Sequence, residues 1–592
     1  MKKYLLYLLF LNFLASYSQQ QAANWYFGDN AGIQFDTSAG TVTTLTDGQL
    51  NTDEGCTSIS DQDGNLLFYT DGITVYDREH RTMPNGLGLK GNPSSTQSAI
   101  IIPIPESDTN YYIFTVDTEF QGTEDEGFHY SEVDMSLNGG FGDVTAIKNR
   151  NLLSNTSEKL SAVLQDCESG NIWVITFADS TGGEVNNTFY AYEVTAAGVN
   201  LTPVVSNAGI NIPERRGYLK FSPDGTRLAC ANISQGLFIF DFDTATGIVS
   251  TPRQIQIQFN SSSAQPQSPY GLEFSPNSEI LYVSTYFETP QADFNNPNAQ
   301  YGALLQYDLS EALIRENVID ARQMYRSALQ LGPDGKIYRS LSDTYNAGTP
   351  FLSVIESPNT VGLGCDYRHA TINLNGRNSR QGLPPFIASF FTEKIDITGN
   401  TSENAYVPLC DGETFTLFAD DIPGATYTWT LDGNPLPEDD FDLEVSGPGN
   451  YELVIDLNTS DCETLEGEAF VEYFPNPTAN DTTLFQCDED GTVDGFTIWN
   501  LMEAEDEITG GTPGLTLKFF NTITDAEDGS GEEDPINFTN TSNPQLLVVK
   551  VTNEESGCYS LSQLSLEVST TQIDDYVAPA ECDELDSEDG IN

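Results

Sequence analysis

Basic residues are scarce in this sequence, which sets 24 Lys and Arg against 88 Asp and Glu and carries a net charge of −64. The imbalance is greatest in residues 393–592, which contain 46 acidic residues and only three lysines. Such a surface repels a phosphate backbone, so we expect no nucleic-acid partner. A well-solvated exterior accounts for the acidic excess without any specific cation.

Histidine is scarcer still. The three histidines, His80, His129 and His369, are scattered and have no partner at metal-ligand spacing. The sequence also lacks a Cys-x-x-Cys pair and a glycine-rich loop of the kind that cradles phosphate. A His-dependent catalytic triad and a nitrogen-ligated metal therefore have no support, and we expect a protein that is not an enzyme. A catalytic pair of carboxylates in one cleft remains an alternative, because the chain is rich in acidic residues.

Long hydrophobic runs are absent beyond the first residues, so we expect no transmembrane segment in the mature chain. Residues 1–18 combine a charged Lys2-Lys3, an apolar stretch from Tyr4 to Leu14 and a small-residue cleavage site. This order is typical of a secretory signal peptide. We therefore expect an exported protein that begins near Gln19 and is located outside the cell or on its outer surface. The nine cysteines are then candidates for disulfide bonds.

What the sequence does contain is a recurring pair of strands joined by a tight turn. The clearest copy is Leu219–Cys230, in which Ser222-Pro223-Asp224-Gly225 supplies the turn. Copies begin at residues 59, 104, 164, 221, 274 and 331, so their spacing lies between 45 and 60 residues. A strand pair that recurs at this period predicts a β-propeller, here over residues 19–392.

The two ends of this region predict how the propeller closes. Short strands over residues 24–36 have no preceding partner, and Pro385–Phe391 is the last strong strand of the region. Pairing them in one blade removes the exposed sheet edge. Six internal repeats and this composite predict seven blades of a WD-repeat-like propeller, although six or eight also fit the spacing.

Residues 393–476 and 477–570 predict two immunoglobulin-like β-sandwich domains, joined at the stiff Pro475-Asn476-Pro477. Each contains a tryptophan between two cysteines, which predicts the disulfides Cys410–Cys462 and Cys487–Cys558. Residues 571–592 open a third repeat, whose Cys582-Asp583-Glu584 echoes Cys487-Asp488-Glu489, so we expect a longer protein. For Cys56, Cys167, Cys230 and Cys365 the sequence predicts no pairing.

Two sets of charged residues are candidate sites. Arg215, Arg216, Arg377 and Arg380 predict a site for an anionic sugar, since guanidinium binds carboxylate through two hydrogen bonds. Pairing with neighbouring acids is the plainer alternative for these arginines. Asp488, Asp490 and Asp494 predict a calcium site, because they place oxygen ligands at alternating positions around a glycine. Screening by solvent is the alternative for these carboxylates, and Asp61-Gln62-Asp63-Gly64-Asn65 is a weaker string of the same kind.

Several segments resemble the propeller of large surface proteins of gliding Bacteroidetes-type bacteria. They are Asn24–Gly28, Gly55–Asp61, Leu67–Gly72, Lys220–Gly225 and Gly382–Phe386. In that family an N-terminal propeller similar to WD-repeat modules precedes immunoglobulin-like repeats. A C-terminal gliding-motility-associated domain then directs export by the type IX system. The 592 residues contain no such sorting domain, and the resemblance supplies no catalytic residues.

The resemblance and the signal peptide together predict a non-catalytic surface or secreted interaction protein. The propeller would bind an extracellular protein or glycan, and the tandem sandwiches would serve as its stalk. The alternative is a glycan-active propeller hydrolase or lyase. Ser222–Thr226 resembles the turn repeated in sialidases, but Arg227 stands where an aromatic residue should follow.

Overall fold

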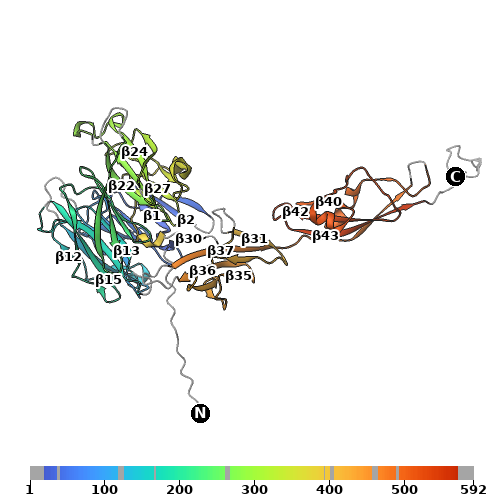
Figure 1. Ribbon diagram of the computed structural model, residues 1–592, viewed down its shortest axis with the longest axis horizontal. Coiled ribbons are helices and arrows are strands. Elements are labelled where there is room, and N and C mark those ends of the chain that lie inside the picture. Colours follow the sequence, from blue (N-terminus) through green and yellow to red (C-terminus); the bar gives the residue numbers. More distant parts are fainter. Residues whose placement is uncertain are drawn as a thin grey trace, which may run out of the picture. The chain divides into compact units, whose positions relative to one another are not determined.

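The computed structural model describes residues 19–36, 40–117, 126–165, 169–183, 185–259, 267–287, 289–311, 313–391, 394–395, 397–399, 406–456, 464–488 and 492–570. The chain forms two compact units (Figure 1). Unit 1 comprises Met1–Ile395, Ile422–Thr426 and Val454–Glu466, and unit 2 comprises Asp396–Asp421, Tyr427–Leu453 and Gly467–Asn592. Nearly all regular structure in the described residues is β-strand, as the sequence predicted.

The described part of unit 1 contains seven antiparallel sheets that follow one another along the chain. The first sheet contains β1 (Asn24–Phe27), β2 (Ala31–Asp36) and β3 (Thr41–Leu45). The second sheet contains β4 (Thr57–Ser60), β5 (Leu66–Thr70), β6 (Thr74–Asp77) and β7 (Thr82–Leu87). The third sheet contains β8 (Ala99–Pro103), β9 (Asn110–Val116), β10 (Phe128–Asp134), β11 (Asp143–Val144) and β12 (Arg150–Leu153). The fourth sheet contains β13 (Leu160–Leu164), β14 (Ile172–Ala178), β15 (Asn186–Thr195), β16 (Gly198–Val199) and β17 (Val204–Ile212). The fifth sheet contains β18 (Leu219–Phe221), β19 (Arg227–Asn232), β20 (Gly236–Asp243) and β21 (Ile248–Ile255). The sixth sheet contains β22 (Ser268–Phe274), β23 (Ile280–Tyr286), β24 (Gly302–Asp308) and β25 (Glu316–Arg322). The seventh sheet contains β26 (Leu329–Leu331), β27 (Ile337–Arg339), β28 (Phe351–Ile355) and β29 (Tyr367–Asn373).

Short 3₁₀ helices lie before, between and after these sheets. They are η1 (Gln19–Ala22), η2 (Asn138–Gly140), η3 (Gln291–Asp293), η4 (Pro297–Ala299), η5 (Gly362–Cys365) and η6 (Ala388–Phe391).

The predicted turns connect the first two strands of these sheets. Between β18 and β19 the Gly225 N–H donates to the Ser222 carbonyl at 2.9 Å, and the Asp224 carboxylate accepts from the Thr226 N–H at 3.0 Å. Gly225 has a φ of 73°, a left-handed conformation that glycine adopts without steric cost. Gly335 has the same φ between β26 and β27. The turn chemistry that located the repeats is therefore confirmed.

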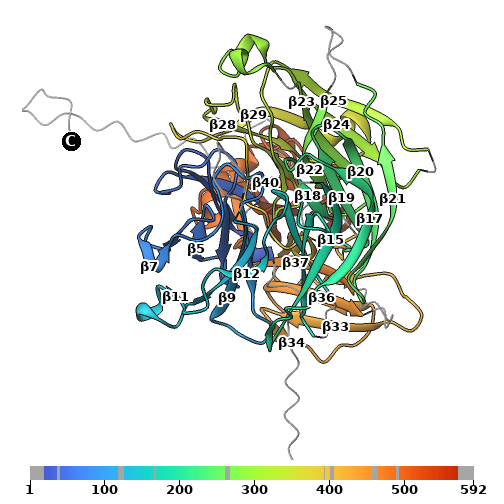
Figure 2. The same ribbon diagram turned by 90° about the vertical axis from the view of Figure 1, so that its left-hand side faces the viewer.

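The seven sheets close into a ring, which defines a β-propeller (Figure 2). Each sheet's first strand packs against the first strand of the next, in the order β1, β4, β8, β13, β18, β22 and β26. The first and last sheets meet through aromatic rings: Trp25 and Phe35 lie 5.5 and 5.2 Å from the ring of Tyr338. Trp25 is completely buried at this junction.

The closure differs from the predicted composite blade. Pro385–Phe391 contributes no strand, and its last four residues form η6. Pro384 and Pro385 lack the N–H that a sheet ladder needs, which accounts for the irregular backbone. The segment still lies at the junction of the ring, because Thr57 Oγ1 donates to the Pro385 carbonyl at 3.2 Å and Phe386 packs 5.9 Å from Trp25.

The C-terminal strands form two groups. We call strands β31–β37 β-domain 1 and strands β38–β43 β-domain 2. The larger sheet of β-domain 1 is β37 (Thr464–Phe474), β36 (Gly449–Asp456), β33 (Thr426–Leu431) and β34 (Asn434–Pro435), with β30 (Lys394–Ile395) and β31 (Tyr406–Cys410) on β37; the smaller pairs β32 (Thr416–Phe418) with β35 (Asp442–Glu444). The sheets of β-domain 2 are β38 (Thr482–Cys487), β43 (Tyr559–Ser569), β42 (Gln545–Asn553) and β40 (Leu515–Phe520), and β39 (Ile498–Trp499) with β41 (Phe538–Thr539). β-domain 2 also contains η7 (Leu501–Ala504), α1 (Glu505–Thr509) and α2 (Ile523–Asp528).

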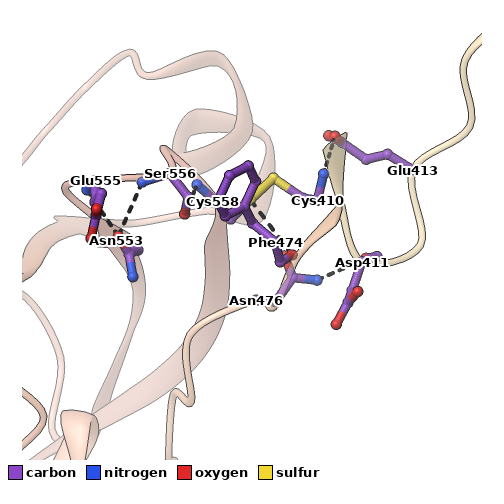
Figure 3. The surroundings of a disulfide bond; sticks show 9 residues. All are labelled: Cys410, Asp411, Glu413, Phe474, Asn476, Asn553, Glu555, Ser556 and Cys558. Atoms are coloured by element: carbon purple, nitrogen blue, oxygen red, sulfur yellow. Dashed lines mark hydrogen bonds between the residues drawn. A yellow bond between two sulfur atoms is a disulfide. The ribbon is translucent and has the colours of Figure 1, made fainter. Parts of the chain in front are cut away.

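A disulfide joins these two β-domains, and it is not one of the predicted pairs. Cys410 bonds to Cys558, with 5.6 Å between their Cα atoms (Figure 3). The prediction of Cys410–Cys462 and Cys487–Cys558 is therefore wrong. Cys487 is an exposed free thiol, and Cys462 lies outside the described residues.

The strand order explains the error. β38 runs parallel to β43, which pairs Cys487 with Ser569 at the last position of that 11-residue strand. Cys558 directly precedes its first position. At about 3.3 Å per residue the two cysteines stand roughly 36 Å apart along the strand, far beyond the reach of a disulfide. Of the cysteines without a predicted pairing, Cys56, Cys230 and Cys365 are buried free thiols, and Cys167 lies outside the described residues.

Candidate functional site

The candidate site is built from the segments at the start of the first strand of the second to seventh propeller sheets, together with Gln381, which follows the seventh sheet. In a propeller the first strands of all sheets run in the same direction along the central axis. The segments that precede these strands therefore lie at the same end of that axis. Main-chain hydrogen bonds connect successive segments there, and we call this feature the axial ring. They run from Glu54 N to Pro93 O, Gln97 N to Glu158 O, Glu158 N to Arg215 O, Tyr218 N to Tyr270 O, Ala328 N to Gln381 O and Gln381 N to Asp53 O, with lengths between 2.8 and 3.2 Å.

An ion pair between the leading segments of β4 and β26 lies inside this ring. Arg326 Nη2 lies 2.6 Å from Glu54 Oε1, and the two side chains are 3% and 1% exposed. The Tyr270 hydroxyl donates to the second oxygen of Glu54 at 2.5 Å, and Arg326 Nε donates to Gln381 Oε1 at 2.5 Å. One buried cluster therefore joins four segments that are distant in the sequence.

Burial governs the charge state of the carboxyl group in this cluster. It raises the pKa of Glu54 to about 7, with the charge of Glu158 adding to the effect. Arg326 and the Tyr270 hydrogen bond act in the opposite direction without cancelling the burial effect. Although burial disfavours its charge, Arg326 has a pKa above the usual range, because Glu54 and the surrounding tyrosines favour the guanidinium form.

Aromatic rings enclose the guanidinium. Its central carbon lies 4.8 Å from the ring centre of Tyr270, 5.3 Å from that of Tyr325, 5.8 Å from that of Tyr286 and 5.9 Å from that of Tyr345. Each distance is within the range of a cation–π interaction. The rings replace water around Arg326 and hold its position.

Other carboxylates in the propeller interior are bound in a similar way. Glu158 accepts from the N–H and the hydroxyl of Thr96 at 2.9 and 2.8 Å. Glu273 lies 2.8 Å from Lys220 Nζ and accepts from the Leu331 N–H at 3.0 Å. These carboxylates connect neighbouring sheets.

Two of the predicted ligand-binding arginines lie in the axial ring. Glu214 accepts from Arg216 Nε and Nη2 at 2.9 and 2.8 Å. Burial opposes the charge of Glu214, but Arg216 outweighs it and lowers the pKa of Glu214 to about 2. The carbonyls of Arg215 and Arg216 accept from Lys159 Nζ at 2.8 and 2.6 Å, and burial lowers the pKa of Lys159. A third of the Arg216 side chain remains exposed.

The other two predicted arginines have different surroundings. Arg380 donates to the Asn346 carbonyl at 2.6 Å and pairs with Asp53, the residue next to Glu54. Arg377 donates to the Thr46 carbonyl at 2.7 Å and is half-buried. The four arginines therefore do not form one pocket with one another.

The sequence interpretation missed Glu54 and Arg326, although a signal for both was present. Each repeat was located by the residue at which its turn motif begins. Glu54, Lys159, Arg216 and Arg326 all stand five positions before such a residue, namely Ile59, Leu164, Phe221 and Leu331. Charged residues at one fixed offset from a structural repeat lie at equivalent places around a ring. That comparison would have selected these four residues from the many charged ones.

The predicted calcium string lies in β-domain 2. Asp488 and Asp494 are described, whereas Asp490 lies outside the described residues. Asp488 Oδ2 accepts from the main-chain N–H groups of Asp494 and Gly495 at 3.0 and 2.8 Å. Among the described residues, no group of three or more His, Cys, Asp or Glu side chains is placed to hold a metal ion.

A hollow of about 610 Å³ lies on unit 1 beside β7 and β11. Its polar groups bind one another: Asn85 Nδ2 donates to Asp143 Oδ1 at 2.8 Å, and Lys148 Nζ donates to the Asn85 carbonyl at 2.7 Å. The described residues contain no helix long and apolar enough to cross a membrane.

Comparison with protein families gives one match. Residues 481–572, a range that includes the strands of β-domain 2, match the family described as the Flavobacterium inter-domain disulphide bond domain. The match indicates a protein of Bacteroidetes type, and it agrees with the bond that Cys558 makes to β-domain 1. No curated protein matches the chain.

Solved structures similar to the chain include several propeller proteins. The periplasmic gluconolactonase PpgL of Pseudomonas aeruginosa is 13% identical, with 78% of this chain and 97% of that chain covered and a TM-score of 0.29. A quinonprotein alcohol dehydrogenase-like protein of Bacteroides thetaiotaomicron is 14% identical, with 61% and 78% covered and a TM-score of 0.34. The Cps50 (Swd1) β-propeller domain of Myceliophteria thermophila is 11% identical, with 55% and 94% covered and a TM-score of 0.31. Similarity at this level carries no argument about activity.

Proposed function

We propose that this protein is an exported, non-catalytic interaction protein of the cell surface or the extracellular medium. Its propeller is the binding head, and the two β-domains form a spacer. Each β-domain is an immunoglobulin-like β-sandwich. A role in gliding motility and export by the type IX system are part of the same proposal. The head is a seven-bladed propeller, with one blade for each of the seven sheets.

The observation that carries this proposal is the saturation of the carboxylates inside the propeller. Glu54, Glu158 and Glu273 are each held by specific partners from other segments. A general acid or nucleophile must reach its substrate, and these groups are instead committed to connecting sheets. The interior is therefore scaffold, and the exposed residues at the end of the axis are left for recognition.

Arg216 is the residue that we assign to ligand binding first. It is partly exposed and its segment belongs to the axial ring; Glu214 holds its Nε and Nη2, so a ligand carboxylate would approach the exposed remainder of the guanidinium. Arg215 lies beside it, and Arg377 and Arg380 extend the basic surface toward an anionic glycan or an acidic protein. Calcium at Asp488, Asp490 and Asp494 would serve β-domain 2 and not the head.

The test is a binding screen with the full chain against neutral and anionic glycans. We expect binding to glycans that carry carboxylates, and a loss of at least tenfold in affinity on Arg216→Gln. The matched control is Arg368→Gln, which removes an arginine whose partners are Asp366 and Glu356. Equal binding by both variants would reject Arg216 as the ligand residue. Hydrolysis of a glycan or an ester that is lost in Glu54→Gln would replace the binding proposal with the enzyme.

A further inference from the structure

Three polar side chains on the first strands of the fifth, sixth and seventh propeller sheets meet inside unit 1. They are Lys220 of β18, Glu273 of β22 and Gln330 of β26, and each directly precedes the residue at which the turn motif of its repeat begins. β18 packs against β22 (Figure 2), and β22 packs against β26. Equivalent positions on consecutive sheets therefore bring an amine, a carboxylate and a carboxamide to one place.

The lysine amine contacts both of the other groups. Lys220 Nζ lies 2.8 Å from Glu273 Oε2 and donates to Gln330 Oε1 at 2.5 Å. Since a C=O bond is about 1.23 Å long, the amide carbon of Gln330 lies within about 3.7 Å of the lysine nitrogen. Reactants that are held for bond formation stand roughly 3–3.5 Å apart. Lys220 and Gln330 are therefore arranged as a nucleophile and its electrophile.

Main-chain groups hold the amide and the carboxylate in this arrangement. Gln330 Nε2 donates to the Leu331 carbonyl at 3.0 Å, while the amide oxygen accepts from Lys220. The Leu331 N–H donates to Glu273 Oε2 at 3.0 Å, and the Phe274 N–H donates to Glu273 Oε1 at 3.1 Å. Both oxygens of the carboxylate are thus fixed, and one of them lies against the amine.

Burial separates these three groups from bulk water. Lys220 is 5% exposed, Glu273 is 4% exposed and Gln330 is 2% exposed. Exclusion of water protects an acyl carbon from hydrolysis and strengthens the polar interactions around it. The lysine amine is thus the nucleophile that meets the Gln330 amide.

We propose that Lys220 and Gln330 form an intramolecular isopeptide bond, with Glu273 transferring the protons. The bond joins β18 of the fifth sheet to β26 of the seventh sheet, across a sequence separation of 110 residues. It therefore connects the two sheets that flank the sixth sheet covalently. The reaction occurs once in each chain and uses no external substrate, so it is independent of the proposed binding function.

The chemistry needs no other reactant. Glu273 takes one proton from the Lys220 ammonium group, and the neutral amine attacks the Gln330 amide carbon to form the new C–N bond. Glu273 then gives its proton to Gln330 Nε2 and takes one from the lysine nitrogen. The bond between the amide carbon and Nε2 breaks, and ammonia leaves. One proton remains on the new amide nitrogen and one on Glu273, so atoms and charge balance.

The test is mass spectrometry of the purified chain. We expect a mass below the sequence mass by one molecule of ammonia, and a tryptic map with a branched peptide that joins Lys220 to Gln330. Cyclisation of an N-terminal glutamine loses the same mass, so the branched peptide decides the result. Unlinked peptides that contain Lys220 and Gln330, without the branched peptide, would overturn the proposal.

Three variants test the assigned roles. Lys220→Arg keeps the positive charge but removes the amine nucleophile, and Glu273→Gln keeps the shape but removes the proton acceptor, so neither should contain the branched peptide. The matched control is Lys336→Arg, which changes a lysine paired with Glu356 and should retain the branched peptide. A branched peptide in Glu273→Gln would contradict the role of Glu273.

The wild-type map decides whether the bond exists, even where a variant does not fold. If circular dichroism shows that Glu273→Gln is unfolded, Glu273→Asp replaces it. The aspartate carboxylate is one methylene shorter, so we expect a mixture of linked and unlinked chains. Complete linkage in Glu273→Asp, at the rate of the wild type, would contradict proton transfer by Glu273.

Discussion

Glu54 and Arg326 come from opposite ends of the propeller sequence, and yet their side chains form a buried ion pair across the closure of the ring. Removing one member of a buried pair leaves the other charge without compensation, which costs about 3–5 kcal/mol. We therefore expect Arg326→Met to lower the free energy of unfolding of the propeller by about that amount. Urea denaturation followed by tryptophan fluorescence measures it.

The matched control for that variant is Arg368→Met, which breaks ion pairs made by a side chain that is 53% exposed. Exposed pairs contribute at most about 1 kcal/mol. Equal destabilisation by the two variants would contradict the assigned role of Arg326.

The raised pKa of Glu54 predicts a specific pH dependence. The pKa of Glu54 is about 7 in the folded protein and 4.5 without the protein environment, so the folded state holds this proton more tightly. Its contribution to stability is complete below pH 4.5 and is lost as the pH rises to about 7. The difference in unfolding free energy between wild type and Glu54→Gln should therefore change with pH across this window. Parallel denaturation curves at pH 4.5 and pH 7.5 measure the difference, and a constant offset would contradict the raised pKa.

Substitution of two glycines that have the same backbone angle distinguishes the cost of a left-handed backbone from the cost of steric crowding. Gly225 and Gly335 both have a φ of 73°, but a Cβ at Gly225 would lie 2.9 Å from Thr244 Cγ2, whereas a Cβ at Gly335 would meet nothing within 4 Å. We expect Gly335→Ala to cost about 1 kcal/mol from the left-handed backbone alone. Gly225→Ala should cost more, and thermal unfolding of the two variants tests the order.

The inter-domain disulfide should stabilise the β-domains, because it closes a separation of 148 residues. In the chain-entropy model a loop of this length contributes up to about 5 kcal/mol. We expect Cys558→Ser to lower the urea midpoint of unit 2, whereas Cys487→Ser should leave the midpoint of the isolated chain unchanged. A shift of equal size in both variants would contradict the assignment of the bond.

The sequence predicted features formed by neighbouring residues better than features formed by residues that are far apart in the chain. The Ser222–Gly225 turn was predicted because its hydrogen bonds join residues within a few positions of one another. The disulfide pairing was wrong because it depends on the parallel contact of β38 with β43, which no short pattern encodes. The strand expected at Pro385–Phe391 was judged from hydrophobicity, and the missing N–H groups of two prolines decided the backbone instead.

The candidate site shows the same division. Arg216 was selected because arginine is rare in this chain, whereas Glu54 is one acid among 88 and its significance comes from its place in the repeat. Burial, which sets its pKa, depends on contacts with Arg326 and Tyr270 that form only in the closed ring.

The axial ring also sets the order in which this chain can mature. The hydrogen bonds at Gln381 join the leading segment of the last sheet, through Ala328, to that of the second sheet, through Asp53. Ribosomes deliver a chain from its N-terminus, so the earliest sheets must wait with one edge unsatisfied until residue 381 has emerged. A nascent chain that has not yet reached Gln381 lacks both of these hydrogen bonds, so the seam between the last and the second sheet stays open and accessible to proteases.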